Sequence, residues 1–346
     1  MNPALPIALD AMGGDHMPEA AVDGALQAAR DGHGVVLVGD EPRLRALLAE
    51  RGGDLPIEHA ADVIGMSEHA TDVRRRKDAS VVVATRMAKD GRAGACVSLG
   101  HSGATMAAAL FVLGRIKGVE RPAILANIPT AQGRHSALID AGANADCRPS
   151  FLQQFAVMGT IYARHVYGIA EPSVGLMSIG EESDKGNELT RETHALLART
   201  AGIRFHGNVE GRDLLLGTTD VVVTDGFTGN VMLKLAEGEA RVIFGLVRDA
   251  LQSGLRAKVG GLLAKSALKR VAARLDPAEV GAQPLLGVDG YAFIGHGSSD
   301  ARAVASAIRT AHQMVRAGVC EHIAEGLHVV RAAQEAAGVT APSDAA

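Results

Sequence analysis

The sequence contains no tryptophan, and only 3% of its residues are aromatic. Its formal net charge is −4, so the chain lacks the cationic stripes and stacking rings on which nucleic-acid binding depends. We therefore expect no nucleic acid among its partners. Cysteine is also scarce, because Cys96, Cys147 and Cys320 are the whole set and form no C-x-x-C motif. An odd number of cysteines favours reduced thiols in the cytoplasm over a disulfide framework.

Several recognisable motifs are missing as well. The 13 histidines include no H-E-x-x-H motif and no paired His/Cys spacing, so we predict no metal site. A P-loop is absent, and so is a G-x-G-x-x-G turn with an acidic residue placed for a ribose, so we predict no cofactor. The N-terminus lacks a cationic leader, and the apolar run from Ala104 to Leu113 is far too short to span a bilayer. The chain is therefore not expected to be integral to a membrane.

Short apolar runs rich in β-branched residues alternate with helical patterns along the chain. Such alternation predicts βαβ units, and hence an α/β fold of three layers with a mainly parallel sheet covered by helices on both faces. The clearest helical patterns span Pro18 to Arg30 and Ser150 to Tyr167. The predicted strands begin at Val35, Ala95, Ala123, Ser173, Asp220 and Tyr291.

No fixed-period repeat and no Pro- or Ser-rich linker divides the chain. We predict a single α/β core over residues 1–332, which could form two lobes around an active cleft. Residues 333–346 lose the apolar periodicity and gain small polar residues, which predicts a flexible tail.

Residues 246–276 predict an amphipathic helical hairpin within this core. The stretch from Ser253 to Leu275 carries six Lys or Arg residues and no acidic residue. Its apolar residues fall into two helical stripes, with a break expected at Gly260 and Gly261: Leu251, Leu255, Val259 and Leu262, then Leu268, Val271 and Leu275. Such a hairpin could lie on an anionic membrane, and a dimer-packing pair with cationic outer faces fits the pattern equally well. The candidate contact residues are Leu255, Arg256, Lys258, Leu262, Lys265 and Lys269.

Five segments share one pattern, in which a strand is followed by a polar turn with glycine and then by a helix. They span residues 8–21, 97–108, 177–192, 222–235 and 293–304. Ligands of open α/β sheets bind beyond the carboxyl ends of the strands, where helix N-termini present free N–H groups. Five such turns favour a phosphate-like ligand at one rim of the sheet, although the same residue types also serve as ordinary helix caps. The candidate phosphate-binding residues are Asp10, Gly13, Gly14, Asp15, Ser98, Gly100, Ser102, Gly103, Gly186, Asn187, Asp225, Gly226, Thr228, Gly229, His296 and Gly297.

Two side chains in these turns are the first candidates for chemistry. Lys185 precedes a helix expected to begin near Glu188, where a positive charge is unfavourable, which indicates an anionic partner. Asn230 ends the run "DGFTGN", and its amide could donate to a carbonyl oxygen or a phosphate, or cap the helix. The carboxylates of Asp10 and Asp15 could bind a metal or substrate hydroxyls, or accept hydrogen bonds from nearby N–H groups.

The blocks "ALDAMGGDHMPEAAVDGALQA", "VSLGHSGATMAAALFVLGRIKGVERPAI", "IGEESDKGNELTRE" and "VVTDGFTGNVMLKLAEG" are long and specific. With the closing "GVDGYAFIGHGSSDARAVASAI" they resemble the PlsX family, the acyl-ACP:phosphate acyltransferases of bacterial phospholipid synthesis, from about Ile7 to Ala317. One turn departs from the family, which usually reads closer to S-A-G-N-T-G-A where this chain has "SLGHSGA". His101 therefore stands where Asn is common, and its role is left open, whereas Ser102 keeps the hydroxyl.

The resemblance implies a fold related to isocitrate and isopropylmalate dehydrogenases and to phosphotransacetylases, usually dimeric. It also implies transfer of an acyl group from acyl carrier protein to inorganic phosphate, with Lys185 and Asn230 as the catalytic residues. Phosphate is then the nucleophile, so no covalent enzyme intermediate is needed. The implied partners are acyl carrier protein, inorganic phosphate, a second copy of the chain, an anionic membrane and the downstream membrane glycerol-3-phosphate acyltransferase. The expected localisation is cytoplasmic with peripheral membrane contact.

The carrier protein is acidic in general, so a basic landing surface is expected. The run Arg74, Arg75, Arg76 and Lys77 is one candidate, although it could equally be a solvated turn ahead of the helix from Ser80. Three other functions compete with the acyltransferase. They are a metal-dependent hydroxyacid dehydrogenase, a short-chain phosphotransacetylase that uses coenzyme A, and a non-enzymatic adaptor that keeps the fold without the chemistry.

Overall fold

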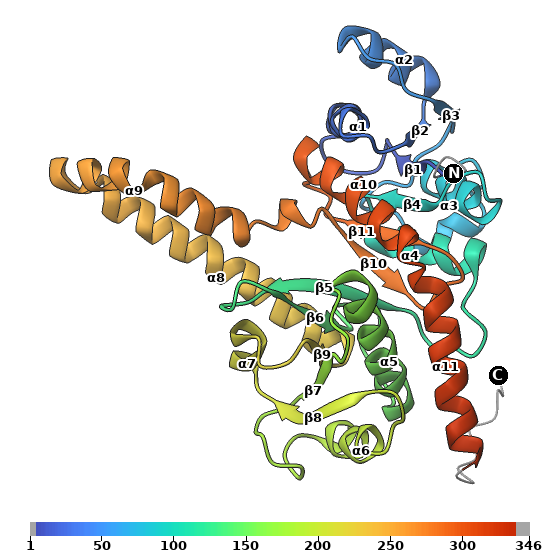
Figure 1. Cartoon of the computed structure of the whole chain (residues 1–346). Coiled ribbons are helices and arrows are strands. Elements are labelled where there is room, and N and C mark those ends of the chain that lie inside the picture. The colour runs from blue at the N-terminus through green and yellow to red at the C-terminus, as the bar shows by residue number, and fades with distance from the viewer. Residues whose placement is uncertain (1–4, 337–346) are drawn as a thin grey trace.

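The computed structural model describes residues 5–336, in which eleven strands form one continuous sheet (Figure 1). The strand order across the sheet is β3-β2-β1-β4-β11-β10-β5-β6-β9-β7-β8. The strands are β1 (Ile7–Asp10), β2 (Val35–Gly39), β3 (Ile57–His59), β4 (Ala95–Ser98), β5 (Ala123–Pro129), β6 (His135–Ile139), β7 (Ser173–Met177), β8 (Arg204–Val209), β9 (Val221–Val223), β10 (Ala282–Leu286) and β11 (Ala292–Gly295).

Helices occupy most of the connections between these strands. The α-helices are α1 (Glu19–Arg30), α2 (Glu41–Glu50), α3 (Ser80–Lys89), α4 (Ser102–Ala108), α5 (Pro149–Val166), α6 (Glu188–Leu197), α7 (Gly211–Leu216), α8 (Gly226–Gln252), α9 (Leu255–Arg274), α10 (Ala301–Arg316) and α11 (Val319–Ala336). Two 3₁₀ turns, η1 (Ala70–Arg74) and η3 (Pro277–Glu279), and one π-helical turn, η2 (Ala109–Leu113), complete the set in the described part of the chain.

The predicted elements are confirmed. All six predicted strands are present and begin within one residue of the expected position, and the two predicted helices correspond to α1 and α5. The sheet is mainly parallel, as predicted, and its antiparallel pairs are β11 with β10, β10 with β5, and β5 with β6. These three reversals lie together in the middle of the sheet, so the strands on either side form two parallel sets.

The core confirms the three-layer architecture. Successive residues of a strand point to opposite faces, and on β9 the side chains of Val221 and Val223 join one apolar cluster while Val222 joins another. Helices α1, α5, α10 and α11 contribute to the first cluster, and α3, α4 and α7 pack on the opposite face. The strands are hydrophobic without alternation because both faces are covered.

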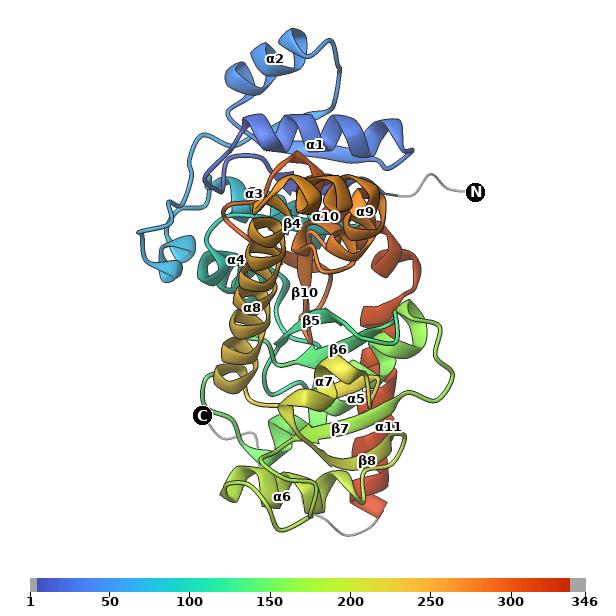
Figure 2. The same ribbon diagram turned by 90° about the vertical axis from the view of Figure 1, so that its left-hand side faces the viewer.

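Helices α8 and α9 form a two-helix arm, residues 226–274, which projects from the sheet (Figures 1 and 2). The chain reverses at Ser253 and Gly254, and α9 continues through Gly260 and Gly261 without interruption. The break predicted at these two glycines is therefore wrong, as are the hairpin bounds of 246–276. A Cβ at Gly261 would lie 3.3 Å from the Cβ of Leu251 on α8. Glycine thus permits close approach of the two helices rather than ending one.

None of the described helices is long and apolar enough to cross a membrane. At the other end of the chain, α11 extends through Ala336, so the first four residues of the predicted tail are helical. Residues 337–346, the rest of that predicted tail, lie outside the described residues.

Two stacked histidines lie where α10 packs near the connection between α1 and β2. The ring centroids of His33 and His312 are 5.3 Å apart, and the His312 Nε2 lies 2.8 Å from the carbonyl oxygen of Gly34. The Nδ1 of His33 is buried without a hydrogen-bond partner among the described residues. Burial is the main cause that lowers the pKa of both histidines, and the Arg316 guanidinium lowers each pKa further.

We expect the free energy of unfolding to fall as the pH is lowered below about 6.5, the ordinary pKa of histidine. Because the folded-state pKa of His33 and His312 is lowered, the unfolded chain binds more protons in this range, and stability present above pH 6.5 is lost as the pH falls. Denaturant unfolding across this range tests the prediction. His312→Gln should flatten the pH dependence, and an unchanged slope would contradict it.

Candidate active site

Three turns at the carboxyl ends of β1, β4 and β11 meet, and we call residues 11–18, 99–101 and 296–300 the first turn group. The backbone N–H of Asp15 donates to the carbonyl oxygen of Gly297 at 2.8 Å. A Cβ added at Gly100 would lie 2.9 Å from the Cα of Gly13, and one at Gly14 would lie 2.9 Å from the carbonyl oxygen of Leu99. Glycine is therefore required at these positions by the close approach of the backbone.

The carboxylate of Asp10 holds the backbone of the first turn group in place. Its side chain is buried, and one carboxylate oxygen accepts the Ser98 hydroxyl at 2.8 Å while the other accepts the N–H groups of Met12 and Gly13 at 3.2 Å. Of the alternatives for Asp10, the structure supports the acceptor of nearby N–H groups. The amide of Gly13 and the hydroxyl of Ser98 are used internally in this arrangement, so their predicted contact with phosphate would require an exchange of partners.

A second turn group, residues 140–144, 178–187 and 224–230, lies at the carboxyl ends of β6, β7 and β9. Its centre is Asp140, a fully buried carboxylate that the sequence analysis did not single out. It accepts backbone N–H groups from Ile124, Gly142, Ala143 and Asn144, and also the Asn144 side-chain amide, at 2.7–3.1 Å. Burial raises the pKa of Asp140, and these donors oppose that effect by favouring the charged form.

The start of α8 rests on this loop. The N–H of Gly226 donates to the carbonyl oxygen of Asn144 at 2.8 Å, and at Gly229 a Cβ would collide with the carbonyl oxygen of Asp140. The position of a Cβ at Gly142 is 3.6–3.7 Å from the side chain of Asn230. Asn230 therefore lies over the loop that Asp140 organises, one turn into α8.

Lys185 and Asn230 are both exposed, and no described residue forms a hydrogen bond or ion pair with either side chain. Lys185 lies in the turn after β7, and Asn230 lies in α8 directly after β9; these two strands pair in parallel. Both predicted catalytic residues thus belong to the second turn group. The Lys185 turn is held by the Asn208 side-chain amide, which donates to the carbonyl oxygen of Glu182 at 2.7 Å.

Two candidates in this group act as helix caps. Asp225 accepts the Thr228 N–H and hydroxyl, each at 2.8 Å, at the start of α8, and Asn187 accepts the Thr190 N–H at 2.9 Å at the start of α6. Gly186 has φ of +98°, and a Cβ there would lie 3.0 Å from the Ser178 hydroxyl oxygen, which is buried and has no partner among the described residues. The remaining candidate side chains, Asp15, Ser102 and His296, are exposed in the first turn group or beside it.

The prediction that five turns form one rim is corrected by the strand pairing. Three antiparallel pairs separate β11 from β6, so β6, β9 and β7 run opposite to β1, β4 and β11. Both turn groups follow the carboxyl ends of their strands, but the two sets of strands point in opposite directions. No hydrogen bond between described residues joins the two groups. The turns form one rim only if all the strands are parallel, and the sequence pattern does not reveal the antiparallel strands at the centre of the sheet.

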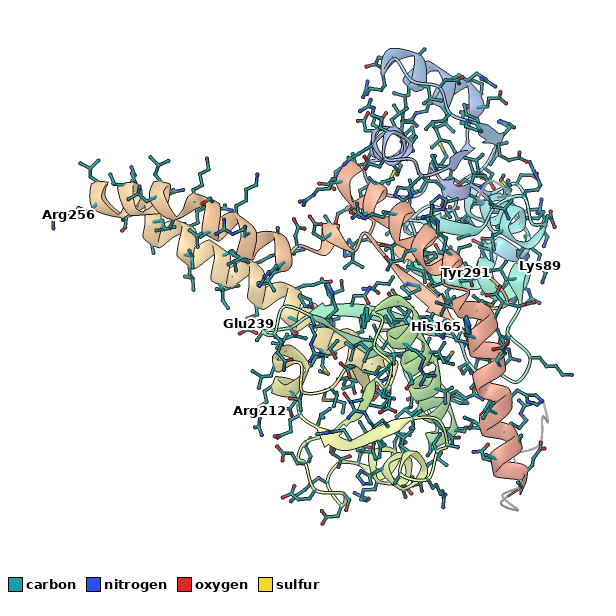
Figure 3. The ribbon with its side chains drawn as sticks, in the orientation of Figure 1. Lys89, His165, Arg212, Glu239, Arg256 and Tyr291 are labelled. Carbon is teal, nitrogen blue, oxygen red and sulfur yellow. The ribbon has the colours of Figure 1, made fainter. Side chains whose placement is uncertain are left out.

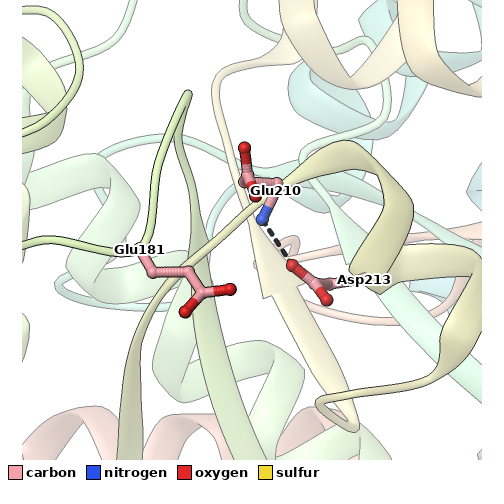
Figure 4. A group of neighbouring side chains, drawn as sticks. All are labelled: Glu181, Glu210 and Asp213. Carbon is pink, nitrogen blue, oxygen red and sulfur yellow. Dashed lines mark hydrogen bonds between the residues drawn. The ribbon is translucent and has the colours of Figure 1, made fainter.

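Three carboxylates, those of Glu181, Glu210 and Asp213, gather beside the second turn group (Figure 4). The Glu210 N–H donates to Asp213 at 2.8 Å, which caps α7, and the Arg212 guanidinium pairs with Glu181 at 3.5 Å and with Glu210. Helix capping and one guanidinium account for this arrangement without a metal ion.

The charged residues of the two predicted partner surfaces have different neighbours in the structure. Arg76 is engaged by Asp62 and Glu68, so it has a structural role that the sequence did not indicate. The Arg74 guanidinium lies 4.7 Å from the Phe111 ring centroid, and Arg75 and Lys77 are exposed.

The cations of α9 are exposed, and none is paired with an acidic side chain among the described residues; Arg256 lies at the far end of the arm (Figure 3). They are Arg256, Lys258, Lys265, Lys269, Arg270 and Arg274.

The sheet and its two turn groups place the chain in a known class of α/β protein. The fold resembles a phosphotransacetylase from Streptococcus pyogenes, with a TM-score of 0.63, 17% identity, and coverage of 91% of this chain and 95% of that one. It also resembles the 4-hydroxythreonine-4-phosphate dehydrogenase from Klebsiella pneumoniae, with a TM-score of 0.55, 14% identity, and coverage of 93% and 100%. At these identities the likeness concerns the fold alone. The predicted likeness in fold to phosphotransacetylases is confirmed, and the likeness in fold to isocitrate and isopropylmalate dehydrogenases stays a prediction.

Sequence comparison identifies the family. A family model described as "Fatty acid synthesis protein" matches residues 5–322. The phosphate acyltransferase of Thermus thermophilus is 60% identical over 321 residues, which cover 93% of this chain and 98% of that protein, and the phosphate acyltransferase of Geobacter sulfurreducens is 49% identical over 324 residues, 92% and 93% of the two chains. The chain belongs to the phosphate acyltransferase (PlsX) family, and it is an acyl-transferring enzyme of fatty acid and phospholipid synthesis.

Gly229→Ala is expected to lower the free energy of unfolding by about 1–3 kcal/mol, because its Cβ would collide with the Asp140 carbonyl oxygen beneath α8. Gly238→Ala in the same helix is the matched control, since nothing lies within 4 Å of its Cβ position. There alanine should stabilise the chain by up to about 1 kcal/mol through helix propensity. Denaturant unfolding measures both, and equal effects at the two positions would contradict the close packing at Gly229.

Proposed function

We propose that this chain transfers a fatty acyl group from the thioester of acyl carrier protein to inorganic phosphate, giving acyl phosphate for phosphatidic acid and phospholipid synthesis. The observation that carries the proposal is the placement of Lys185 and Asn230. Both side chains follow the carboxyl ends of adjacent parallel strands, β7 and β9, and both lack a partner among the described residues. An ammonium and a carboxamide at the ends of neighbouring strands, each without a partner among the described residues, suit an anionic, carbonyl-containing substrate.

The proposed reaction needs no enzyme nucleophile. An oxygen of hydrogen phosphate attacks the thioester carbonyl carbon, the C–O bond forms, the C–S bond breaks, and the proton of the phosphate passes to the departing thiolate. The three thiols support this choice, because burial raises the pKa of Cys96 and Cys147 to about 12 and that of Cys320 to about 11. A thiol of such pKa is a poor nucleophile near neutral pH.

Lys185 and Asn230 then act by positioning and by electrostatics. The ammonium would offset charge on phosphate or on the oxyanion that develops at the thioester, and the carboxamide would donate a hydrogen bond to the same region. Holding phosphate against the carbonyl carbon converts a bimolecular step into an oriented one. Glycine N–H groups of the first turn group are the proposed phosphate cradle.

Strand twist supports a cleft shared by the two turn groups. Five pairings separate β4 from β9 in the strand order, and adjacent strands rotate by roughly 20–25° each. The accumulated rotation is on the order of 100°, so carboxyl ends that would be opposite in a flat sheet are turned toward one side. A substrate that spans both groups is consistent with this geometry.

The fold alone does not separate the competing functions, because it occurs in phosphotransacetylases and in a dehydrogenase. Incubation of the pure protein with long-chain acyl carrier protein and phosphate, followed by assay of acyl phosphate, separates them. Acyl phosphate formed only from acetyl coenzyme A would instead favour the short-chain phosphotransacetylase. An absence of product from either donor would refute the proposal.

Lys185→Ala and Asn230→Ala are each expected to lower kcat/KM by about 10²–10³-fold, the usual loss when a transition-state donor is removed. The thermal unfolding temperature should change little, because both side chains are exposed and unpaired. Lys117→Ala, which removes another exposed ammonium, is the control and should keep normal turnover. Near-normal activity of folded Lys185→Ala would contradict the assigned role.

We also propose that the arm contacts an anionic membrane surface. No residue of α9 is buried, Leu255 and Leu262 are 82% and 71% exposed, and the cations of this helix have no acidic partner among the described residues. Apolar side chains interleaved with unpaired cations suit a layer of anionic headgroups over apolar chains. The exposed cations of α9, together with Arg74, Arg75 and Lys77, are the proposed contacts for the acidic carrier protein.

The double variant Leu255→Gln with Leu262→Gln is expected to lose flotation with liposomes that contain anionic lipid, because it removes the apolar part of the contact. Leu215→Gln with Leu216→Gln, two exposed leucines of α7, is the matched control and should float normally. The mass of each variant in solution is measured in parallel. Unchanged flotation with a reduced mass would contradict the membrane proposal and assign the arm to contact with a second copy of the chain.

A further inference from the structure

Residues 62–79 form a strap that lies along α4 and over the first turn group. The two ends of the strap lie side by side. The N–H of Ser80, which directly follows the strap, donates to the carbonyl oxygen of Asp62 at 2.8 Å. Within it, the Arg76 guanidinium donates to Asp62, to Glu68 and to the carbonyl oxygen of Val63, each at 2.5–2.6 Å. These internal bonds make the strap one unit.

Three contacts place the strap on the glycine turns. The Met66 Cε lies 3.1 Å from the Cβ position of Gly297, and the Ala70 Cβ lies 3.1 Å from that of Gly103. Val73 is buried in an apolar cluster with Ile64 of the strap and with Ala104 and Ala108 of α4. The strap therefore covers the turns that follow β4 and β11, which belong to the proposed phosphate cradle.

One polar contact joins the middle of the strap to these turns. Among the described residues, the hydrogen bond between His101 Nε2 and the Glu68 carbonyl oxygen, at 3.0 Å, is the one that connects residues 63–76 with residues outside the strap. The other ring nitrogen, Nδ1, accepts the Ala104 N–H at 3.2 Å as the cap of α4. With Nδ1 accepting, Nε2 carries the hydrogen and donates to the Glu68 carbonyl oxygen.

We propose that the strap closes over the proposed phosphate cradle and that His101 is the positioning residue that latches it there. This inference rests on the proposed function for its ligand, inorganic phosphate, and goes beyond it by assigning a role to His101 and to residues 62–79. The imidazole contacts neither reacting atom; it acts through the strap. A closed strap slows the loss of phosphate from the turns, so the latch affects the KM for phosphate more than kcat.

The variant His101→Asn removes the hydrogen bond to the strap but keeps the cap of α4. Asparagine is a preferred N-cap residue and can still accept the Ala104 N–H, but its side chain is too short to reach the Glu68 carbonyl oxygen as well. His101→Ala removes both contacts. His69→Asn is the matched control, because His69 lies within the strap and its side chain forms no hydrogen bond with a described residue.

The test is amide hydrogen exchange on the full chain, with and without inorganic phosphate, combined with kinetics in varied phosphate. One net hydrogen bond shifts an opening equilibrium by roughly two- to tenfold, so His101→Asn should speed exchange in residues 65–76 and raise the KM for phosphate by that factor. Its kcat should stay within about twofold, its thermal unfolding temperature should change little, and phosphate should slow exchange of the strap in the unmodified chain.

Unchanged exchange in His101→Asn, or an equal rise in His69→Asn, would overturn the latch. Faster exchange with an unchanged KM for phosphate would overturn the link between the strap and phosphate. Failure of the proposed function would look different. The unmodified chain would then make no acyl phosphate, while the comparison of exchange in His101→Asn and His69→Asn would still decide whether the latch exists.

Discussion

Two buried carboxylates, Asp10 and Asp140, hold the backbone turns on which the proposed chemistry depends. Each lies at or directly after the carboxyl end of a strand, and each accepts hydrogen bonds from the N–H groups of the turn that follows. An unpaired buried charge would be very costly, so every one of these donors matters to the fold. The carboxylates fix the loops, and the glycines of the same loops let strands and helix starts approach closely.

Asp140 has the larger effect because it connects several elements. It joins β5 through Ile124 to the loop after β6, and this loop supports the glycines at the start of α8. Asn230 lies over the same loop. This loop fixes the backbone from which the Asn230 side chain extends, which supports the preorganisation that the proposed catalysis requires. The turn of Lys185 on neighbouring β7 is held separately, by the side-chain amide of Asn208.

The arm, in contrast to the core, has few buried residues. The core strands are covered on both faces, whereas α8 has only Gly226 and Gly229 buried and α9 has no buried residue. A pair of helices with long apolar side chains in water gains little from packing on each other alone. The exposed apolar side chains support the proposed contact of the arm with an anionic surface. The cations of α9, which have no acidic partner among residues 5–336, would give that contact an electrostatic preference for negative charge.

Much of this molecule could be predicted locally. Six predicted strands, two predicted helices and the polar glycine turns are found where the periodicity and the turn residues place them, because strand and helix patterns depend on near neighbours in the chain. The family motifs predict Lys185 and Asn230 as catalytic residues from the sequence alone, and that role stays a prediction. Roles that depend on distant partners could not be found in this way. Arg76 was assigned to a surface but is bound by Asp62 and Glu68, and Asp140 carried no motif because its donors come from β5 as well as from its own loop.

The amino-acid sequence by itself determined the elements, their apolar faces and the kind of chemistry that the turns can support. Only the tertiary structure decided how those turns are grouped. Three antiparallel pairs at the centre of the sheet reverse the direction of one parallel set, and strand order is a property of non-local pairing that no local pattern encodes. The turn of the arm at Ser253 and Gly254, rather than at Gly260 and Gly261, has the same origin, since the packing of α9 on α8 outweighs the weak helix preference of glycine.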